Sequence, residues 1–465
     1  MSRVRGIVVL LAGGLAACTL APRYERPEAP VPEAFEGVAA TSDETPAADI
    51  AWSEFFPDAE LRDLIRRALA NNRDLRVATL NVEAARAQYR IQRADLVPAI
   101  DATGTADNER VPPSLSPTGE GEVTRTYSAG LATTAFELDL FGRVRSLRKA
   151  ALERYFALEE NRTAAQIALV SEVASAWLTL VADRELLALA EATRESQHTS
   201  YELTRLRFEQ GVSSEIELHR AESTWREAEV DIAQQKRRVA TDRNALALLI
   251  GEALPPETGA GGRKLEAQTF GGQLPAGLPA ELLARRPDIR AAEHALKASN
   301  ADIGAARAAF FPSIELTGFY GNASDDLSEL FQGGNERWSF IPQIRLPIFA
   351  GGANKATLDL ATVRRQTDVA RYELAIQVAF REVADALVAR TTLEEQLRAQ
   401  EALTGAARAS YRLADMRYRS GVDSYLGALI AQRDLYDAER ALIVTRLAAT
   451  VNLVQLYRTL GGGWQ

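Results

Sequence analysis

Two very long stretches of helical periodicity dominate the pattern of hydrophobic and polar positions. From Arg143 to Glu209 no Pro or Gly occurs, and from Asn354 to Ser420 only Gly405 interrupts the pattern. Apolar side chains recur in both stretches at alternating spacings of three and four, which is typical of a coiled-coil seam. These positions are Ile167, Val170, Ala174, Trp177 and Val181 in the first stretch, and Tyr372, Ile376, Ala379, Val383 and Ala386 in the second.

Each long helix is predicted to end at a glycine and to turn back. Gly211 and Gly421 follow the two stretches, and a further helix of roughly 35 residues follows each glycine. A helix of ~65 residues extends roughly 100 Å at the usual rise per residue. The pattern predicts two antiparallel helical hairpins. It leaves open whether the hairpins form solid coiled coils or the wall of a hollow cylinder.

The periodicity changes from helical to alternating after Pro98 and after Pro312. Segments 100–107 and 313–320 alternate apolar and polar residues, and second alternating segments follow within 127–140 and 338–348. Strands with one apolar and one polar face suit a membrane barrel with a wet lumen, whereas a soluble sandwich would contain more hairpins. A barrel needs about eight strands. We therefore predict that four strands per chain are sealed against lipid by association of several chains.

The order of these elements occurs twice, because the chain contains an internal repeat. At an offset of 214 residues, Asp74-Leu75-Arg76 matches Asp288-Ile289-Arg290, and at an offset of 210, Gly211-Val212 matches Gly421-Val422. We interpret residues 59–280 as a first repeat of helix, two strands, long helical hairpin and equatorial linker. Residues 281–465 are the second repeat.

The N-terminus has the features of a secretion signal followed by a lipidation site. Arg3 and Arg5 precede a short apolar run, and Leu15-Ala16-Ala17-Cys18 resembles a bacterial lipobox. Residues 1–17 are predicted to be the signal peptide, and Cys18, the only cysteine, is predicted to be acylated. The alternative is an ordinary signal peptide with an incidental cysteine. Thr19, in place of Asp, implies sorting to the outer membrane in lipobox families.

The segment that follows the lipobox is rich in proline. Residues 18–58 also contain few apolar side chains, which predicts an extended, mostly irregular tether from the lipid to the folded body. No run of 18 or more apolar residues occurs after the signal. We therefore expect no helical membrane span and assign any crossing to strands.

Charge and composition exclude several classes of function. The net charge is −9, from 54 basic and 63 acidic residues, and no long basic run indicates a nucleic-acid partner. His198, His219 and His294 lack metal-ligand spacing, and neither a phosphate-binding loop nor a serine-hydrolase elbow occurs. We expect no catalysis, no cofactor and no bound metal.

Four segments resemble the outer-membrane factor family of TolC-like ducts, and specifically its NodT-type lipoprotein branch. They are LARRPDIRAAEHALKASNADIGAARAAFFPSIELTG from Leu283 to Gly318, WSEFFPDAELRDLIRRALANNRDLRVA from Trp52 to Ala78, FELDLFGRVR from Phe136 to Arg145, and RYRSGVDSYLGALIAQRDLYDAE from Arg417 to Glu439. They are distributed over most of residues 50–460. The resemblance implies an α+β membrane protein in which three chains form a 12-stranded outer-membrane β-barrel, four strands from each, continuous with a periplasmic α-barrel of long helical hairpins.

The same resemblance implies the function and the partners. Such a trimer is a passive exit duct of a tripartite efflux system, which exports small molecules such as drugs. It docks to a periplasmic adaptor and to an inner-membrane pump of the RND type that supplies the energy. The protein would lie in the outer membrane, with a lipid anchor on the periplasmic side and a periplasmic tunnel.

In this family the helix tips form the closed periplasmic entrance and contact the adaptor. Three copies of Asp423 brought close together would repel one another and favour cation binding or partial protonation. Many relatives carry Asp where this chain has Ile430, so an apolar constriction is the alternative to an acidic ring. The candidate tip residues are Phe208, Gly211, Glu215 and Glu217 in the first repeat, and Tyr418, Arg419, Gly421, Asp423, Ser424, Tyr425 and Leu426 in the second.

Two other functions remain open at this point. One is the outer-membrane conduit of a type I protein secretion system. The other is a lipid-anchored coiled-coil scaffold without a pore. Neither the identity of the exported substrates nor that of the pump follows from these residues.

Overall fold

A computed structural model describes residues 19–32, 34–35, 47–116, 119–259, 264–268, 270 and 285–464. The predicted signal peptide and Cys18 lie outside the described residues. The chain divides into two compact units, and each unit takes segments from both halves of the sequence. Unit 1 comprises residues 1–28, 81–159 and 291–373, and unit 2 comprises residues 29–80, 160–290 and 374–465.

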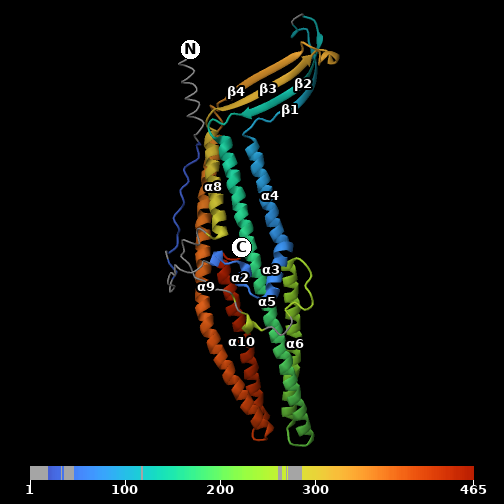
Figure 1. The fold of residues 1–465 in the computed structure, drawn as a ribbon, viewed down its shortest axis with the longest axis vertical. Coiled ribbons are helices and arrows are strands. Elements are labelled where there is room, and N and C mark those ends of the chain that lie inside the picture. Colours follow the sequence, from blue (N-terminus) through green and yellow to red (C-terminus); the bar gives the residue numbers. More distant parts are fainter. Residues whose placement is uncertain are drawn as a thin grey trace. The chain divides into compact units, whose positions relative to one another are not determined.

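Unit 1 contains one antiparallel sheet of four strands in the order β1-β2-β3-β4 (Figure 1). Its strands are β1 (Asp101–Val111), β2 (Glu122–Glu137), β3 (Ser313–Ser324) and β4 (Glu336–Arg345). The prediction of four alternating strands is confirmed. β2 ends at Glu137 and does not continue to residue 140, and its pairing with β3 is irregular between Thr133 and Phe136.

The two faces of the sheet differ in chemistry, because neighbouring residues of a strand point to opposite faces. The register pairs Leu131 with Tyr320 and Tyr320 with Trp338, so these side chains share one face. All three are more than half exposed, as are Phe340 and Ile344 on the same face. The opposite face carries mostly polar residues, which include Asp101, Thr103, Thr105, Asp107, Ser128, Glu315, Gln343 and Arg345. An exposed apolar face and a polar face are the arrangement expected of strands between lipid and a wet lumen.

The N-terminal segment 19–26, which we call the strap, is held against α8 (Pro287–Ala308). The Tyr24 hydroxyl and the Arg26 guanidinium both donate to the Glu293 carboxylate, at 3.1 Å and at 2.8–3.1 Å. The Asn300 amide donates to the Pro22 carbonyl at 2.8 Å. Because the Glu293 side chain is only 7% exposed, these contacts give a buried carboxylate its partners. This part of the predicted tether therefore follows a defined path along unit 1.

The corresponding helix of the first repeat, α4 (Arg73–Ala94), has no buried residue. Val77, Leu80 and Ile91 are each more than half exposed. Exposed apolar side chains along a whole helix indicate a surface that is covered by another molecule.

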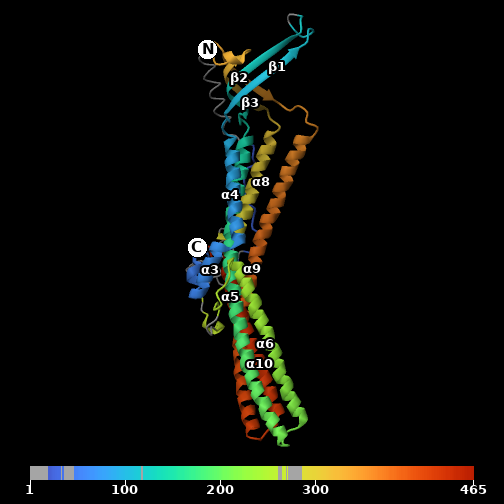
Figure 2. The same ribbon diagram turned by 90° about the vertical axis from the view of Figure 1, so that its right-hand side faces the viewer.

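Unit 2 contains the lower parts of two helical hairpins, which Figure 2 shows side by side near their turns. The first hairpin consists of α5 (Arg143–Glu209) and α6 (Glu215–Ile250), and the second of α9 (Ala353–Arg419) and α10 (Tyr425–Thr459). The predicted hairpins are confirmed, and the bounds of α5 agree with the sequence pattern at both ends. The remaining helices among the described residues are η1 (Ala47–Asp49), α2 (Trp52–Phe55), α3 (Ala59–Asn71), η2 (Leu265–Ala267) and η3 (Leu327–Glu329).

An aromatic core holds unit 2 together. Trp177, Phe55, Phe56 and Tyr457 are at most 1% exposed, and the rings of Phe55 and Tyr457 stack at 4.0 Å. The buried Tyr457 hydroxyl donates to the Ile50 carbonyl at 2.6 Å. The predicted tether included Ile50, Phe55 and Phe56. The structure differs there from an irregular tether, because these side chains are buried in the core of unit 2.

One helix of the described part of the chain, α5, is long and apolar enough by composition to cross a membrane. The sequence analysis expected no helix of this kind, because it considered uninterrupted runs of apolar residues and not the mean hydropathy of a segment. In the apolar window 56% of the residues are buried, and Val173, Ala174 and Trp177 of this helix lie in the core of unit 2. The apolar character of α5 is thus explained by burial within the protein.

Candidate functional site at the hairpin tips

Each hairpin turns through a glycine with a left-handed backbone. Gly211 has φ 74° and Gly421 has φ 73°. Residues with a Cβ atom rarely adopt this left-handed conformation, whereas glycine adopts it readily. The Val212 amide donates to the Arg207 carbonyl at 2.8 Å, and the Val422 amide donates to the Arg417 carbonyl at 2.9 Å. These bonds close the helix end in the Schellman arrangement. The two tips therefore share one backbone design.

The first tip is completed by a capping box. The Ser214 hydroxyl accepts from the Glu217 amide at 3.3 Å, and the Glu217 carboxylate accepts from the Ser214 amide at 3.1 Å. The Ser213 hydroxyl also donates to Glu217 at 2.6 Å, and this bond, followed by the one from Ser214, lowers the pKa of Glu217. Glu217 was a candidate gate residue from the sequence. In the structure its carboxylate is engaged in starting α6.

The second tip is held by an ion pair in place of the capping box. The Arg417 guanidinium donates to both oxygens of Asp423, at 2.5 and 3.0 Å. The side chain of Ser424 makes no capping bond, and Gly427 stands where the first tip has Glu217. Arg417 holds the pKa of Asp423 below its ordinary value. Within the single chain the carboxylate therefore has a cationic partner, and the partial protonation expected where three copies of Asp423 meet stays a prediction.

Two tyrosines of the second tip are buried between the hairpins. Tyr418 is 5% and Tyr425 is 4% exposed, and they pack with Ala221 and Ala428. The Arg207 guanidinium lies over the Tyr418 ring, 4.5 Å from its centre. Burial raises the pKa of Tyr425 to about 12, and its hydroxyl lacks a hydrogen-bond partner among the described residues. Sequence reasoning missed Arg207, although its match with Arg417 in the repeat could have drawn attention to it.

Both tips expose several apolar side chains. Val212 is 77%, Ile216 67% and Val422 62% exposed, and Phe208, Leu426 and Ile430 are exposed to a smaller extent. Among the charged candidates, Arg419 pairs with Asp415 at 2.9 Å, and Glu215 lies 3.8 Å from the His219 ring. Exposed apolar side chains rimmed by charges are typical of a contact surface for another protein.

A shallow hollow adjoins the first tip on α6. It measures about 410 Å³ and is lined by Glu215, Ile216, His219, Arg220 and Ser223. His219 has carboxylates on both sides, at 3.8 Å from Glu215 and 3.6 Å from Glu222. No group of residues in the described ranges has the composition and geometry to hold a metal ion.

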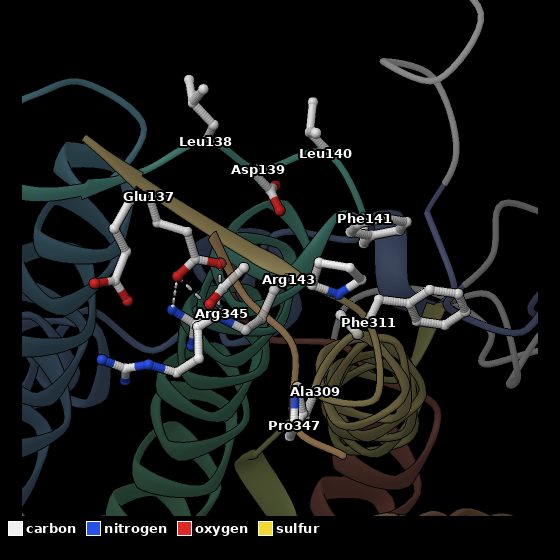
Figure 3. A pocket seen from close by; sticks show the side chains of 14 residues that line it. Glu137, Leu138, Asp139, Leu140, Phe141, Arg143, Ala309, Phe311, Arg345 and Pro347 are labelled. Carbon is white, nitrogen blue, oxygen red and sulfur yellow. Dashed lines mark hydrogen bonds and ion pairs between the residues drawn. The ribbon is translucent and has the colours of Figure 1, made fainter. Parts of the chain in front are cut away.

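A second cavity, of about 250 Å³, lies in unit 1 where the strands meet the helix ends (Figure 3). Leu138 and Leu140 point away from it, Asp139 points toward it, and Phe141 stacks on Phe311 at 4.8 Å. Two of its acidic groups are paired: Arg143 binds Glu137 through two nitrogens, and Arg145 binds Asp139 at 3.1 Å. These pairs join the end of β2 to the first turns of α5. They explain the change from strand to helix at this place.

Comparisons with known proteins agree with this architecture. The family model described as outer membrane efflux protein matches residues 64–252 and 278–462. The probable efflux pump outer membrane protein TtgC of Pseudomonas putida is 50% identical over 97% of this chain and 93% of its own length. The outer membrane protein OprJ of Pseudomonas aeruginosa is 46% identical over 98% of this chain and 95% of its own.

Solved structures show the same fold. A membrane protein from Pseudomonas aeruginosa superimposes with a TM-score of 0.89 at 44% identity, covering 96% of this chain and 98% of that one. The MtrE outer membrane channel of Neisseria gonorrhoeae, in its open state, also gives 0.89, at 42% identity, covering 96% and 99%.

The structural neighbours are trimeric outer-membrane efflux channels, and the helical hairpins and four-stranded sheet of this chain match their fold. That is the assembly expected from an exposed apolar sheet face and from α4 without a buried residue. The family is a transport conduit of efflux systems in the outer membrane. This chain therefore belongs to the outer membrane efflux protein family.

Proposed function

We propose that this channel exports small apolar or amphipathic organic molecules, and that the hairpin tips form its closed entrance. The observation that carries the assignment of a duct is the four-stranded sheet, which has one apolar and one polar face and is joined directly to helices of 67 residues. Three such chains place the polar faces around a lumen. The lumen then needs a closure, and the tips supply the side chains for one.

The class of substrate is supported by what the relatives export. One relative that is 50% identical is named a toluene efflux pump outer membrane protein, and another at the same identity is named for antibiotic efflux. A passive duct needs no pocket of its own for the cargo, since selection occurs in the pump. We therefore assign the range of substrates to the pump and the exit route to this chain.

The closure at the tips is apolar in this proposal. Ile430 is 52% and Leu426 is 45% exposed on α10, whereas the nearest candidate acid, Asp423, is paired with Arg417. Apolar side chains that meet around a narrow axis exclude water and ions by dewetting. Glu215, Arg419 and Phe208 then surround the constriction on its outer side.

The partners are a periplasmic adaptor and an inner-membrane pump of the RND type. Val212, Ile216 and Val422 form the exposed apolar part of the tips, and Glu215, His219 and Arg220 add charges beside it. An adaptor with a complementary amphipathic end would bury these side chains. A type I secretion pump is the second candidate partner, and the efflux names of the relatives favour the first.

Cys18 is the proposed site of the lipid anchor. The strap supports this role, because Thr19 is hydrogen-bonded to Ser146 at 3.3 Å and the Leu20 carbonyl accepts from Arg307. Thr19 therefore lies beside the first turn of α5. Acyl chains attached there would secure the chain to the outer membrane.

Export can be tested with a strain that lacks this chain but retains its pump and adaptor. We expect the strain to accumulate a fluorescent amphipathic dye, and the intact chain to restore export. Ile216→Asp at the tip should abolish restoration because it places a charge in the adaptor contact. Val230→Asp is the matched control, since Val230 is 57% exposed on the same helix away from the tip. If both variants restore export of the dye equally, the tip is not the surface that contacts the adaptor. If the deletion strain does not accumulate the dye, the channel does not export this class of molecule.

A further inference from the structure

Two arginines lie on the apolar face of the sheet, near the turn that joins β1 to β2. The register pairs Ala102 with Leu131 and Asn108 with Arg125. Because residues two apart on a strand share a face, Arg110 and Arg125 point to the same side as Leu131, and both are exposed. They belong to neighbouring strands and to adjacent rungs of this face. We call them the arginine pair.

The arginine pair lies at the level of the outer leaflet. β1 begins on the periplasmic side, after the C-terminal end of α4, and its turn to β2 lies at the end of the sheet away from α8 (Figure 1). Ile100, the residue before β1, and Arg110 are ten residues apart. At ~3.3 Å per residue and a strand tilt of ~40°, this separation gives a height of roughly 25 Å, which equals that of the apolar band of a membrane barrel. The guanidinium groups therefore reach the polar edge of the outer leaflet.

The chain itself does not neutralise these charges. Neither Arg110 nor Arg125 forms an ion pair with a carboxylate of the described ranges. Arg125 acts electrostatically on Asp326, in the turn between β3 and β4, but the Asp326 carboxylate accepts hydrogen bonds from the Ser328 amide and hydroxyl, at 2.8 and 2.7 Å. A guanidinium group stays charged at physiological pH. The pair therefore offers positive charge to an anion from outside the chain.

The β3–β4 hairpin differs from the β1–β2 hairpin on the same face. At the offset of 214 residues, Arg110 corresponds to Ser324. The charged residue of the β3–β4 hairpin on this face is Glu336, whose carboxylate accepts from the Tyr320 hydroxyl. Arg337 is exposed but points to the polar face, because it follows Glu336 on the strand. Among the described strands, basic residues on the apolar face are thus confined to the β1–β2 hairpin.

The surface between the arginine pair and Leu131 suits hydrocarbon chains. It carries Tyr127, Ala106, Gly104 and Ala129 on the same face. Three of these four residues are small, so an acyl chain has room to lie close to the two strands. The Tyr127 ring lies one rung below Arg125, and aromatic side chains of membrane barrels gather at the interface with the headgroups. Positive charge, an aromatic ring and small apolar residues therefore follow one another from the outer edge toward the middle of the membrane.

We propose that the arginine pair binds the phosphate groups of lipid A, the phosphorylated glycolipid part of lipopolysaccharide in the outer leaflet. The planar guanidinium group binds a phosphate through two parallel hydrogen bonds, and the acyl chains of the same molecule cover the apolar face below. An arginine that faces lipid is costly at the bilayer midplane and nearly without cost at the interface, where a phosphate makes its position favourable. A trimer has three such sites, one on each chain.

Native mass spectrometry of the purified trimer tests the site, because it counts bound lipid molecules. The probe is bisphosphorylated lipid A. The double variant Arg110→Gln with Arg125→Gln removes the pair, and Arg337→Gln is the matched control on the polar face. We expect up to three bound molecules per trimer, and a dissociation constant about ten-fold higher in the double variant because two charge-assisted contacts are lost. The constant for Arg337→Gln should stay within roughly two-fold of that of the unaltered chain.

The same spectra distinguish lipid A from other occupants. Lipid A without its phosphates should bind the unaltered trimer about ten-fold more weakly, a comparison that does not depend on the folding of any variant. Phosphatidylglycerol, which has one phosphate and no sugar, should not displace lipid A at equal concentration, and displacement would mean that any anionic lipid occupies the site. Unchanged affinity in the double variant, or an equal loss in Arg337→Gln, would overturn the site. If the double variant loses its trimer and keeps its affinity for lipid A, the arginines bind Glu336 of the partner subunit and not a lipid.

Discussion

The two helical hairpins are joined to the rest of unit 2 at corresponding places but by different chemistry. Where α4 follows α3, the Asn72 amide donates to the Leu249 carbonyl in the last turn of α6, at 2.8 Å. At the matching place in the second repeat, the Arg286 guanidinium donates to the Thr459 carbonyl in the last turn of α10, at 3.0 Å. The same helix end is thus held by a neutral amide in hairpin 1 and by a cation in hairpin 2.

Arg286 also makes contacts that Asn72 cannot make. It pairs with Asp288 at 2.6 Å and with Glu382 of α9 at 2.9 Å, while its side chain is only 9% exposed. Hairpin 2 is therefore fixed at this end by a charge network that reaches both of its helices. The two repeats share the helix lengths and the position of this contact. Their side chains differ there, because a neutral amide binds the end of α6 and a charged network binds the end of α10.

The largest expected difference in the free energy of unfolding is the one between Arg286→Ala and Asn72→Ala. Arg286→Ala removes the buried cation of the network, leaves Asp288 without this partner and leaves Glu382 only Arg458, at 4.0 Å. We therefore expect a loss of about 3 kcal/mol in the free energy of unfolding. Asn72→Ala removes a neutral contact and should cost about 1 kcal/mol. Denaturant unfolding of the purified protein measures both. An equal or larger loss for Asn72→Ala would show that the charge network of Arg286 does not hold hairpin 2 more strongly than Asn72 holds hairpin 1.

The two tips should respond differently to loss of the serine before the second helix. Ser214→Ala removes a capping bond and should destabilise the first turn of α6 by about 1 kcal/mol. Ser424→Ala should have almost no effect, because the Ser424 side chain makes no such bond. Hydrogen exchange of the amides of residues 215–218 and 425–428 reports each turn separately. Faster exchange at the second tip would show that Ser424 caps its helix after all.

Both tips should nevertheless loosen over the same acid range. The pKa of Glu217 and that of Asp423 are lowered in the folded chain, so both carboxylates stabilise the tips at neutral pH. This contribution is fully present above the ordinary carboxyl pKa of about 4 and is lost as the pH falls through the lower folded values. Exchange at the tips, corrected for its intrinsic dependence on pH, should rise only below that range. Glu217→Gln should remove the rise in exchange rate at the first tip alone. A rise that begins near neutral pH would contradict the lowered pKa values of the two carboxylates.

The smallest effect is expected for Tyr425→Phe. Its hydroxyl is buried without a hydrogen-bond partner in the described part of the chain, so its removal should leave the free energy of unfolding within about 0.5 kcal/mol. Tyr436→Phe is the contrasting variant in hairpin 2, because it removes the bond to Asp231 and should cost about 1 kcal/mol. Equal losses in a denaturant titration would mean that the Tyr425 hydroxyl is satisfied in the assembled protein.

Elements that depend on local periodicity were predicted well. The bounds of α5 and the presence of α6 and α10 agree with the pattern, and four strands occur where alternation begins after Pro98 and Pro312. The irregularity of β2 near Ala135, which has a positive φ, was not predicted. An alternating pattern does not reveal where the pairing with a strand almost 200 residues away shifts.

The candidate site was predicted less completely. Gly211 and Gly421 were found as turns because glycine before a polar helix start is a local signal. The orientation of Tyr418 and Tyr425 and the engagement of Glu217 and Asp423 were not found. Their positions relative to a tip follow from the sequence, but whether a side chain faces a lumen, a partner or the other hairpin depends on which helices lie beside it.

The lengths of the helices, the places where the chain turns and the need for other copies to seal the strands can all be derived from the sequence, because each follows from hydrophobic period and strand number. The tertiary structure was needed to show that the strap binds Glu293 and that Arg207 covers Tyr418. It was also needed to show that Arg286 joins the start of α8, the end of α10 and the interior of α9. These contacts connect residues between about 95 and 270 positions apart in the chain, and no local pattern encodes the packing that brings such residues together.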